Sequence, residues 1–123
     1  MSRSEFAPGF GISASWPAGR RAYVRLAGDL VAVCRPLRRF HEAGWPGTVR
    51  DFSLSGVGLL VRHRFGPGTT LHVELLESSG KLLRTVEVHV IHATAVLVEG
   101  SPRWLLGCTL DQPFSDDVFR SLL

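Results

Sequence analysis

The stretch from residue 82 to residue 98, LLRTVEVHVIHATAVLV, decides the fold class of this chain. It is rich in valine and threonine, which favour extended backbone. Within it, Val86, Val88 and Val90 alternate with polar residues, so that one face is apolar and the other is polar. This period of two predicts a long, half-buried β-strand.

Turns and further strands surround this stretch. The segments SSGK and EGSPR, on either side of it, contain the glycine and proline that predict turns. Beyond these turns, and towards the N-terminus, apolar and β-branched runs predict further strands, separated by GWPG, SLSG and GPG. The predicted strands are residues 23–37, bent at Gly28, and residues 48–53, 56–65, 69–77, 82–98 and 104–110.

The last nine residues, SDDVFRSLL, follow a different pattern. Ser115 can cap a helix, and Asp116 and Asp117 favour its first turn. Six short strands followed by one helix predict a small all-β barrel or sandwich. The absence of alternating strands and helices argues against a doubly wound nucleotide-binding fold.

The composition is that of one folded domain with a basic balance. The 123 residues are 45% hydrophobic and 20% charged, with a net charge of +3. Lys81 is the only lysine, so arginine carries the positive charge, and guanidinium groups suit recognition of phosphates. Residues 1–19 are rich in Gly, Pro, Ser and Ala and are expected to form a flexible tail, with the domain in residues 20–123.

The sequence offers no motif for catalysis, metal binding or membrane insertion. Cys34 and Cys108 lie in apolar runs, which favours two reduced thiols in a cytoplasmic protein. His89 and His92 would face opposite sides of a regular strand, which favours surface or hydrogen-bonded histidines over metal ligands. With neither a nucleophile elbow nor a P-loop, the chain is expected not to be an enzyme and to hold no metal or cofactor. No apolar run is long enough to cross a membrane.

Three arginines crowd together where the tail meets the first predicted strand. They are Arg20, Arg21 and Arg25, in the segment RRAYVR. Like charges at this spacing repel each other unless an anion offsets them. A guanidinium can hold phosphate oxygens or pair with the O6 and N7 acceptors of guanine. The segment is therefore either a binding loop for such groups or a solvated basic patch.

A second polar segment, DFSLSGVG, begins at Asp51. In an extended chain Asp51 and Ser53 face the same side, about 6–7 Å apart, where they could bond a nucleotide base. Gly56 and Gly58 would let the backbone approach a ligand closely. The alternative is that Asp51 and Ser53 satisfy backbone groups of a turn. In a regular strand Val49 would share a face with Asp51, so strict alternation does not describe this segment simply.

The two segments together resemble the paired signature of the PilZ family, RxxxR and [D/N]xSxxG. Arg21 and Arg25 match the first motif, and Asp51, Ser53 and Gly56 match the second, in the same order. The resemblance covers the whole of the chain after the tail. It implies a six-stranded antiparallel β-barrel with a short C-terminal α-helix. It also implies that the arginine loop wraps around cyclic di-GMP, a bacterial second messenger, on the surface of the barrel.

The resemblance also implies roles for individual residues. Arg21 and Arg25 would contact the phosphates and the guanine Hoogsteen edges, with Arg20 as a third contact. Asp51 would accept hydrogen bonds from the guanine Watson–Crick side. Ser53 would bond the base, and Gly56 would leave room for the ligand. Gly58 is a further candidate, for which strand geometry is the alternative role.

Three functions remain open on these grounds. The first is a cyclic di-GMP receptor whose arginine loop becomes ordered on binding and which then acts on a protein partner that the sequence does not identify. The second is a PilZ-like adaptor that binds protein but no nucleotide. The third is a basic barrel for single-stranded nucleic acid, which is disfavoured because only Tyr23 among the arginines offers a ring for base stacking.

Overall fold

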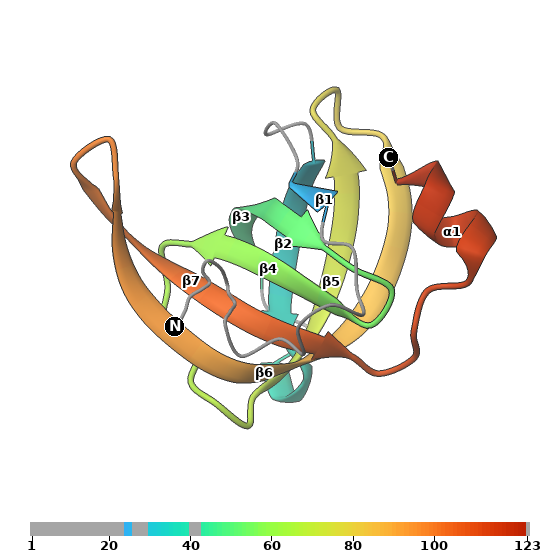
Figure 1. Cartoon of the computed structure of the whole chain (residues 1–123). Helices are drawn as coiled ribbons and strands as arrows, with labels where there is room; N and C mark the ends of the chain where they lie inside the picture. The colour runs from blue at the N-terminus through green and yellow to red at the C-terminus, as the bar shows by residue number, and fades with distance from the viewer. Residues whose placement is uncertain (1–23, 26–29, 40–42, 123) are drawn as a thin grey trace.

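The computed structural model describes residues 24–25, 30–39 and 43–122, and in these residues seven antiparallel strands and one short helix are found (Figure 1). The expected tail, residues 1–19, lies outside the described residues. The elements are β1 (Val24–Arg25), β2 (Leu30–Pro36), a 3-10 turn (Leu37–Arg39), β3 (Trp45–Phe52), β4 (Gly56–Val61), β5 (Thr70–Glu77), β6 (Leu82–Val98), β7 (Ser101–Leu110) and α1 (Asp116–Ser121).

Six of the strands close into a barrel. The strand order is β1-β3-β2-β5-β6-β7-β4, and an additional pairing of β3 with β4 joins the two sides of the sheet. The two-residue strand β1 pairs with β3 outside this ring. Closure leaves the six barrel strands without a free edge. The predicted six-stranded antiparallel barrel with a C-terminal helix is therefore confirmed.

Alternation along the strands builds the interior. In β2 the residues Leu30, Ala32 and Cys34 are buried, and their neighbours in the strand are partly exposed. The same pattern holds in β5, whereas in β4 and β7 outer-face residues such as Gly58 and Gly107 are buried as well. All of these strands contribute residues to one shared core. Burial of a Val, Leu or Phe side chain contributes about 1.5–3 kcal/mol, which makes this core the main source of stability.

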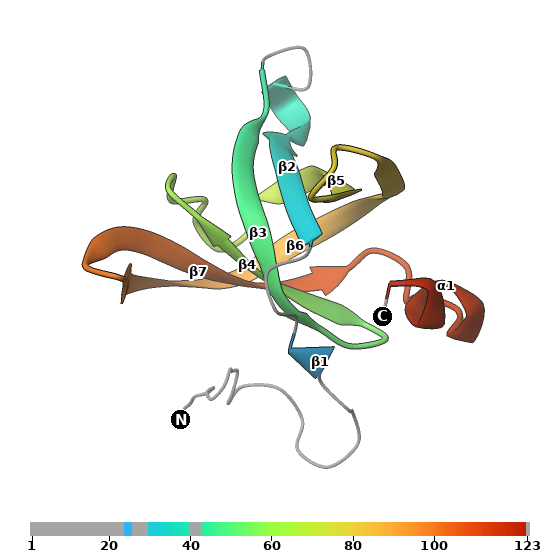
Figure 2. The same ribbon diagram turned by 90° about the horizontal axis from the view of Figure 1, so that it is seen from above.

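The long strand β6 has the bounds that its alternation predicts, and its length has a structural reason. Its first half pairs with β5, and its second half pairs with β7 over the full length of that strand. Figures 1 and 2 show β6 sweeping around the barrel and joining these two sides. Val88 and Val90 lie in the core, and Val86 packs against it.

Helix α1 covers one end of the barrel (Figure 2). Ser115 caps it as predicted, because its hydroxyl oxygen accepts a hydrogen bond from the Val118 N–H at 3.2 Å. Phe119 of the helix packs edge-on against Phe52, with ring centroids 5.1 Å apart, and Phe114 packs against the same ring at 6.1 Å. The helix thus closes the core beside the end of β3. It is also too short to cross a membrane.

Two turns predicted from the sequence differ in the structure: GWPG does not form a turn, and the turn in EGSPR is shorter than predicted. The segment GWPG was expected to be a turn, but Trp45, Pro46 and Gly47 belong to β3 and pair with β2. Pro46 is tolerated because pairing with β4 begins only at Gly47, so that its missing N–H is not needed on that side. The turn between β6 and β7 consists only of Glu99 and Gly100, both with positive φ, as two-residue hairpins require.

Candidate functional site

A β-bulge at Arg50 decides which way Asp51 points. Val49 and Asp51 pair with consecutive residues of β4, so Arg50 is the extra residue of the bulge. Val49 faces the core and is only 2% exposed. Because the bulge interrupts the alternation, Asp51 does not share the face of Val49 and lies on the outer face. Phe52 then returns to the core. The bulge is the irregularity that the sequence pattern indicated at this point.

Gly58 makes room for the Asp51 carboxylate. Gly58 is the partner of Asp51 on β4. A Cβ atom at Gly58 would lie 2.6 Å from Asp51 Oδ1, closer than such contacts ever come. The carboxylate therefore lies over the glycine, in the space that any other side chain would fill. It is only 5% exposed although it faces outward. A shielded carboxylate is a strong hydrogen-bond acceptor for a ligand that reaches it.

Ser53 lies in the turn between β3 and β4. Its backbone N–H donates to the Gly56 carbonyl at 2.9 Å, and its hydroxyl oxygen accepts from the Ser55 N–H at 3.4 Å. These bonds are those expected if the residue satisfies the backbone of a turn. They leave the hydroxyl proton of Ser53 as a donor. Gly56 begins β4, where it pairs with Thr109.

The backbone brings Arg25 next to Asp51. The short strand β1 pairs with β3 in the register Val24 to Phe52 and Arg25 to Asp51. Cross-strand partners lie about 4.5–5.5 Å apart at their Cα atoms. Residues 26 positions apart in the sequence are therefore neighbours in the sheet, as a joint binding site for RxxxR and DxSxxG requires. Arg20 and Arg21 lie outside the described residues.

Gly107, which neither of the two motifs includes, continues the same row of positions. Gly107 of β7 is the partner of Gly58 on β4. Two glycines side by side leave space on the outer face of the sheet for side chains from the neighbouring strands, such as Asp51. A Gly in the middle of the apolar run WLLGCTL was the available signal, because glycine inside a strand often marks a close approach.

A second hollow lies at another part of the barrel. It is an open pocket of about 660 Å³ between the 3-10 turn and the segment that joins β4 to β5. Trp45 stacks on His63 beside it, with ring centroids 4.3 Å apart, and His63 contacts Phe65 edge-on. None of the predicted ligand-binding residues lines this pocket. Its lining residues are Pro36, Leu37, Arg38, His63, Phe65, Pro67, Gly68, Thr69 and Thr70.

The other titratable groups of the described residues do not gather into a metal site. His89 is hydrogen-bonded on both ring nitrogens, to Thr70 Oγ1 and to Asp111 Oδ1, each at 3.1 Å. Both cysteines are free thiols in the core. Burial raises the pKa of the Cys34 thiol to about 12, and it raises the pKa of Cys108 as well. Neither thiol is therefore a nucleophile at neutral pH.

Comparison with solved structures identifies the same fold in proteins of low sequence identity. The PilZ domain of Escherichia coli YcgR, solved with c-di-GMP, is 14% identical, with a TM-score of 0.63 and 86% of each chain covered. The K. pneumonia MrkH–c-di-GMP complex is 16% identical, with a TM-score of 0.61 over 85% of this chain and 49% of MrkH. Borreliella burgdorferi PlzA in complex with c-di-GMP is 13% identical, with a TM-score of 0.56 over 80% of this chain and 47% of PlzA.

The chain thus spans about half the length of MrkH and of PlzA, and most of the YcgR domain. No curated protein matches it in sequence. Residues 19–122, however, match the PilZ domain family. This range spans both polar segments, the barrel strands and helix α1. The chain therefore belongs to the PilZ domain family.

Proposed function

We propose that this chain is a non-catalytic receptor domain that binds cyclic di-GMP on the outer face of β1, β3 and β4. The observation that carries the proposal is the row formed by Arg25, Asp51 and Gly58, which are partners on three neighbouring strands. It places a cationic residue, a shielded carboxylate and a side-chain-free position next to one another. These are the groups that a ligand with two phosphates and two guanines needs.

Each part of the ligand has a counterpart in this row or in the two motif arginines that precede it in the sequence. The guanidinium groups of Arg20, Arg21 and Arg25 offer charge-assisted hydrogen bonds to phosphate oxygens and to guanine O6 and N7. The Asp51 carboxylate offers acceptors for the amino and imino donors of guanine. Gly58 keeps that carboxylate over the sheet surface.

Ser53 and Gly56 contribute through the turn that follows Asp51. The Ser53 hydroxyl accepts from Ser55 N–H and retains its own proton, which it can donate to a base. Gly56 closes the turn with its carbonyl, and its lack of a side chain would leave room for the ligand. The turn would therefore hold one side of the ligand while the arginines hold the other.

The signalling step is proposed to follow from ordering of the arginine loop. Ligand binding would fix the segment around residues 20–25 and so create a surface that a partner protein recognises. Two free, buried thiols support a cytoplasmic setting for this exchange. Since similar domains occur within chains about twice as long, the partner could be a further domain or a separate protein.

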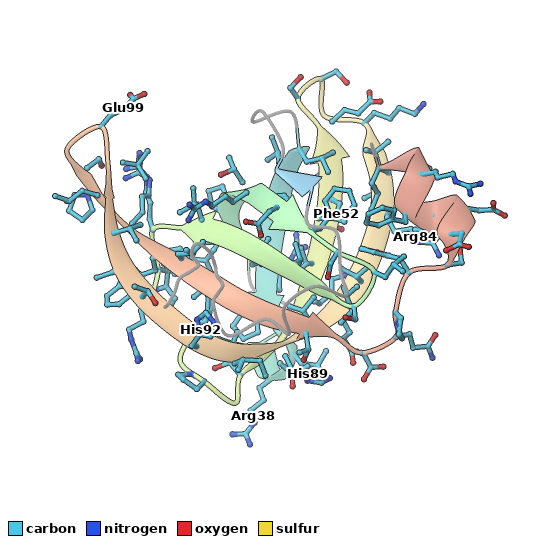
Figure 3. All side chains as sticks on the ribbon, viewed as in Figure 1. Arg38, Phe52, Arg84, His89, His92 and Glu99 are labelled. Atoms are coloured by element: carbon cyan, nitrogen blue, oxygen red, sulfur yellow. The ribbon has the colours of Figure 1, made fainter. Side chains whose placement is uncertain are left out.

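The direct test is calorimetric titration with cyclic di-GMP. The parent chain should bind saturably, and GTP should not mimic the ligand. Arg21→Ala and Asp51→Ala should each weaken binding about tenfold to over a hundredfold, the effect of losing charge-assisted bonds. Arg84→Ala is the matched control, because Arg84 is exposed on β6 beside α1 and pairs with β5, away from β3 (Figure 3).

Binding that the two site variants lose and the control variant keeps would establish the receptor function and give the stoichiometry. No binding by a folded parent chain would overturn the proposal and favour the adaptor that binds protein but no nucleotide.

A further inference from the structure

A second β-bulge lies at the far end of the same row of positions. Val90 and His92 of β6 pair with consecutive residues of β7, Cys108 and Gly107, so Ile91 is the extra residue. Val90 and Cys108 face the core. The bulge therefore turns His92 to the outer face, as the bulge at Arg50 does for Asp51.

The imidazole of His92 lies over Gly107. A Cβ atom at Gly107 would be 2.4 Å from His92 Cε1 and 2.5 Å from Nε2. The outer edge of the ring thus occupies the space that a side chain at this position would fill. This is the relation that Asp51 has to Gly58. Figure 3 shows His92 on β6 where this strand passes β7.

The two arrangements meet in the middle of the row. Gly58 and Gly107 are partners on the adjacent strands β4 and β7. Asp51 leans over the first glycine from β3, and His92 leans over the second from β6. Adjacent strands are about 4.8 Å apart, so the carboxylate and the imidazole lie side by side on the sheet within the width of one base.

We propose that His92 is a further ligand-contacting residue, which donates a hydrogen bond to the same guanine whose donors face Asp51. The inference rests on the proposed function and adds a residue to its site. The Watson–Crick edge of guanine carries two donors, N1–H and the 2-amino group, next to one acceptor, O6. A carboxylate beside an imidazole N–H offers the complementary pattern of acceptors and donor.

This pattern predicts selectivity for guanine. Adenine carries an amino group where guanine carries O6, and it has an acceptor where guanine has N1–H. The amino group would face the imidazole N–H, and the ring nitrogen would face the carboxylate. Both pairs would be mismatched, so the site would disfavour cyclic di-AMP.

Three variants test the role of His92 by titration with cyclic di-GMP, beside competition by cyclic di-AMP. His92→Ala removes the ring, and His92→Phe keeps a ring over Gly107 but has no N–H donor. Each should weaken binding of cyclic di-GMP about fivefold or more, the effect of one lost hydrogen bond to a buried group. In the same two His92 variants, binding of cyclic di-AMP should be no weaker than in the parent. His89→Ala, on the same strand and outer face, is the matched control and should bind as the parent does.

Thermal unfolding of each variant checks that the protein whose binding is compared with that of the parent is folded. Parent-like binding by His92→Phe or by His92→Ala would overturn the inference, as would an equal loss in His89→Ala. Equal loss of both dinucleotides in the His92 variants would assign the residue a structural role and would also overturn it. If the parent binds cyclic di-GMP and loses it with Asp51→Ala, the proposed function stands in all of these cases. If the parent does not bind, both proposals fail.

Discussion

The inner face of the barrel and the outer row from β3 to β6 are built in different ways. Inside, strands such as β2 and β5 pair over seven positions without a break in register, and every second residue packs into one core. In the outer row, a bulge stands at each end and two glycines stand between. Regular alternation is enough to make a stable interior. The candidate site needs departures from it, because a bulge is what moves a polar side chain from one face to the other.

The largest expected effect lies on the inner face. Phe52→Ala removes a ring that is only 1% exposed and that packs against Phe114 and Phe119. It should lower the free energy of unfolding by about 3–5 kcal/mol, as large core truncations do. Denaturant unfolding measures this change. A loss below about 1 kcal/mol would mean that the Phe52 ring does not join helix α1 to the core.

A substitution in the middle of the outer row should lower stability less than Phe52→Ala does, and it should also lower the affinity for the ligand. Gly58→Val places a side chain against the Asp51 carboxylate, which should cost about 1–3 kcal/mol of stability. It should also weaken cyclic di-GMP binding at least tenfold, because the carboxylate must move. Gly66→Ala is the control, since its new Cβ would meet only the end of the Arg64 side chain. Unchanged binding by a folded Gly58→Val variant would show that Gly58 does not position Asp51.

Alkaline pH should destabilise the interior of the barrel, where the two thiols are buried. The Cys34 thiol has its pKa raised from 9.0 to about 12 by burial, so it stays neutral in the folded state while the unfolded thiol ionises above pH 9. The stability from the neutral thiol is thus complete below pH 9 and is lost as the pH rises towards 12. Each pH unit in that range should cost about 1.4 kcal/mol for this group.

Unfolding by urea at pH 8 and at pH 10 measures this effect. Cys34→Val is the control, because it removes the titrating group and keeps the apolar volume. Its stability should fall less than that of the parent between the two pH values, with Cys108 responsible for part of the remaining loss. An equal fall in both proteins would show that Cys34 does not contribute to the pH dependence.

The smallest effect is expected at the bulge residue of β6. Ile91 is 53% exposed, so Ile91→Ser should change the free energy of unfolding by no more than about 0.5 kcal/mol. Binding of cyclic di-GMP should also stay within twofold of the parent value, because the position of His92 depends on the extra residue and not on its side chain. A large loss of affinity would show that the Ile91 side chain helps to set the bulge.

The sequence predicted much of the fold because the main signals are local. The bounds of β6 followed from its alternation and its flanking turns, and the cap of α1 followed from Ser115 and the acids after it. The start of β3 was missed, since Trp45, Pro46 and Gly47 carry the local preference of a turn. Pairing with β2 overrides that preference, and this pairing is not visible in a local window.

The candidate site was predictable only in part. The resemblance of the two motifs implied that Arg25 and Asp51 reach the same ligand, and the register of β1 with β3 makes them cross-strand partners. The binding roles of Arg20, Arg21, Arg25, Asp51, Ser53, Gly56 and Gly58 remain predictions. The sequence indicated only a surface or hydrogen-bonded histidine at His92, since a regular strand gives no reason to bring it near Asp51.

By itself, the sequence determined which residues are apolar in a period of two, where the chain turns, and the order of the two motifs. These properties depend on side chains within a few residues of one another. Only the tertiary structure decided that positions 25, 51, 58, 107 and 92 form one row across five strands. The physical reason is that strand register and bulges are set by hydrogen bonds between segments far apart in the sequence, and these bonds are fixed only when the whole barrel closes.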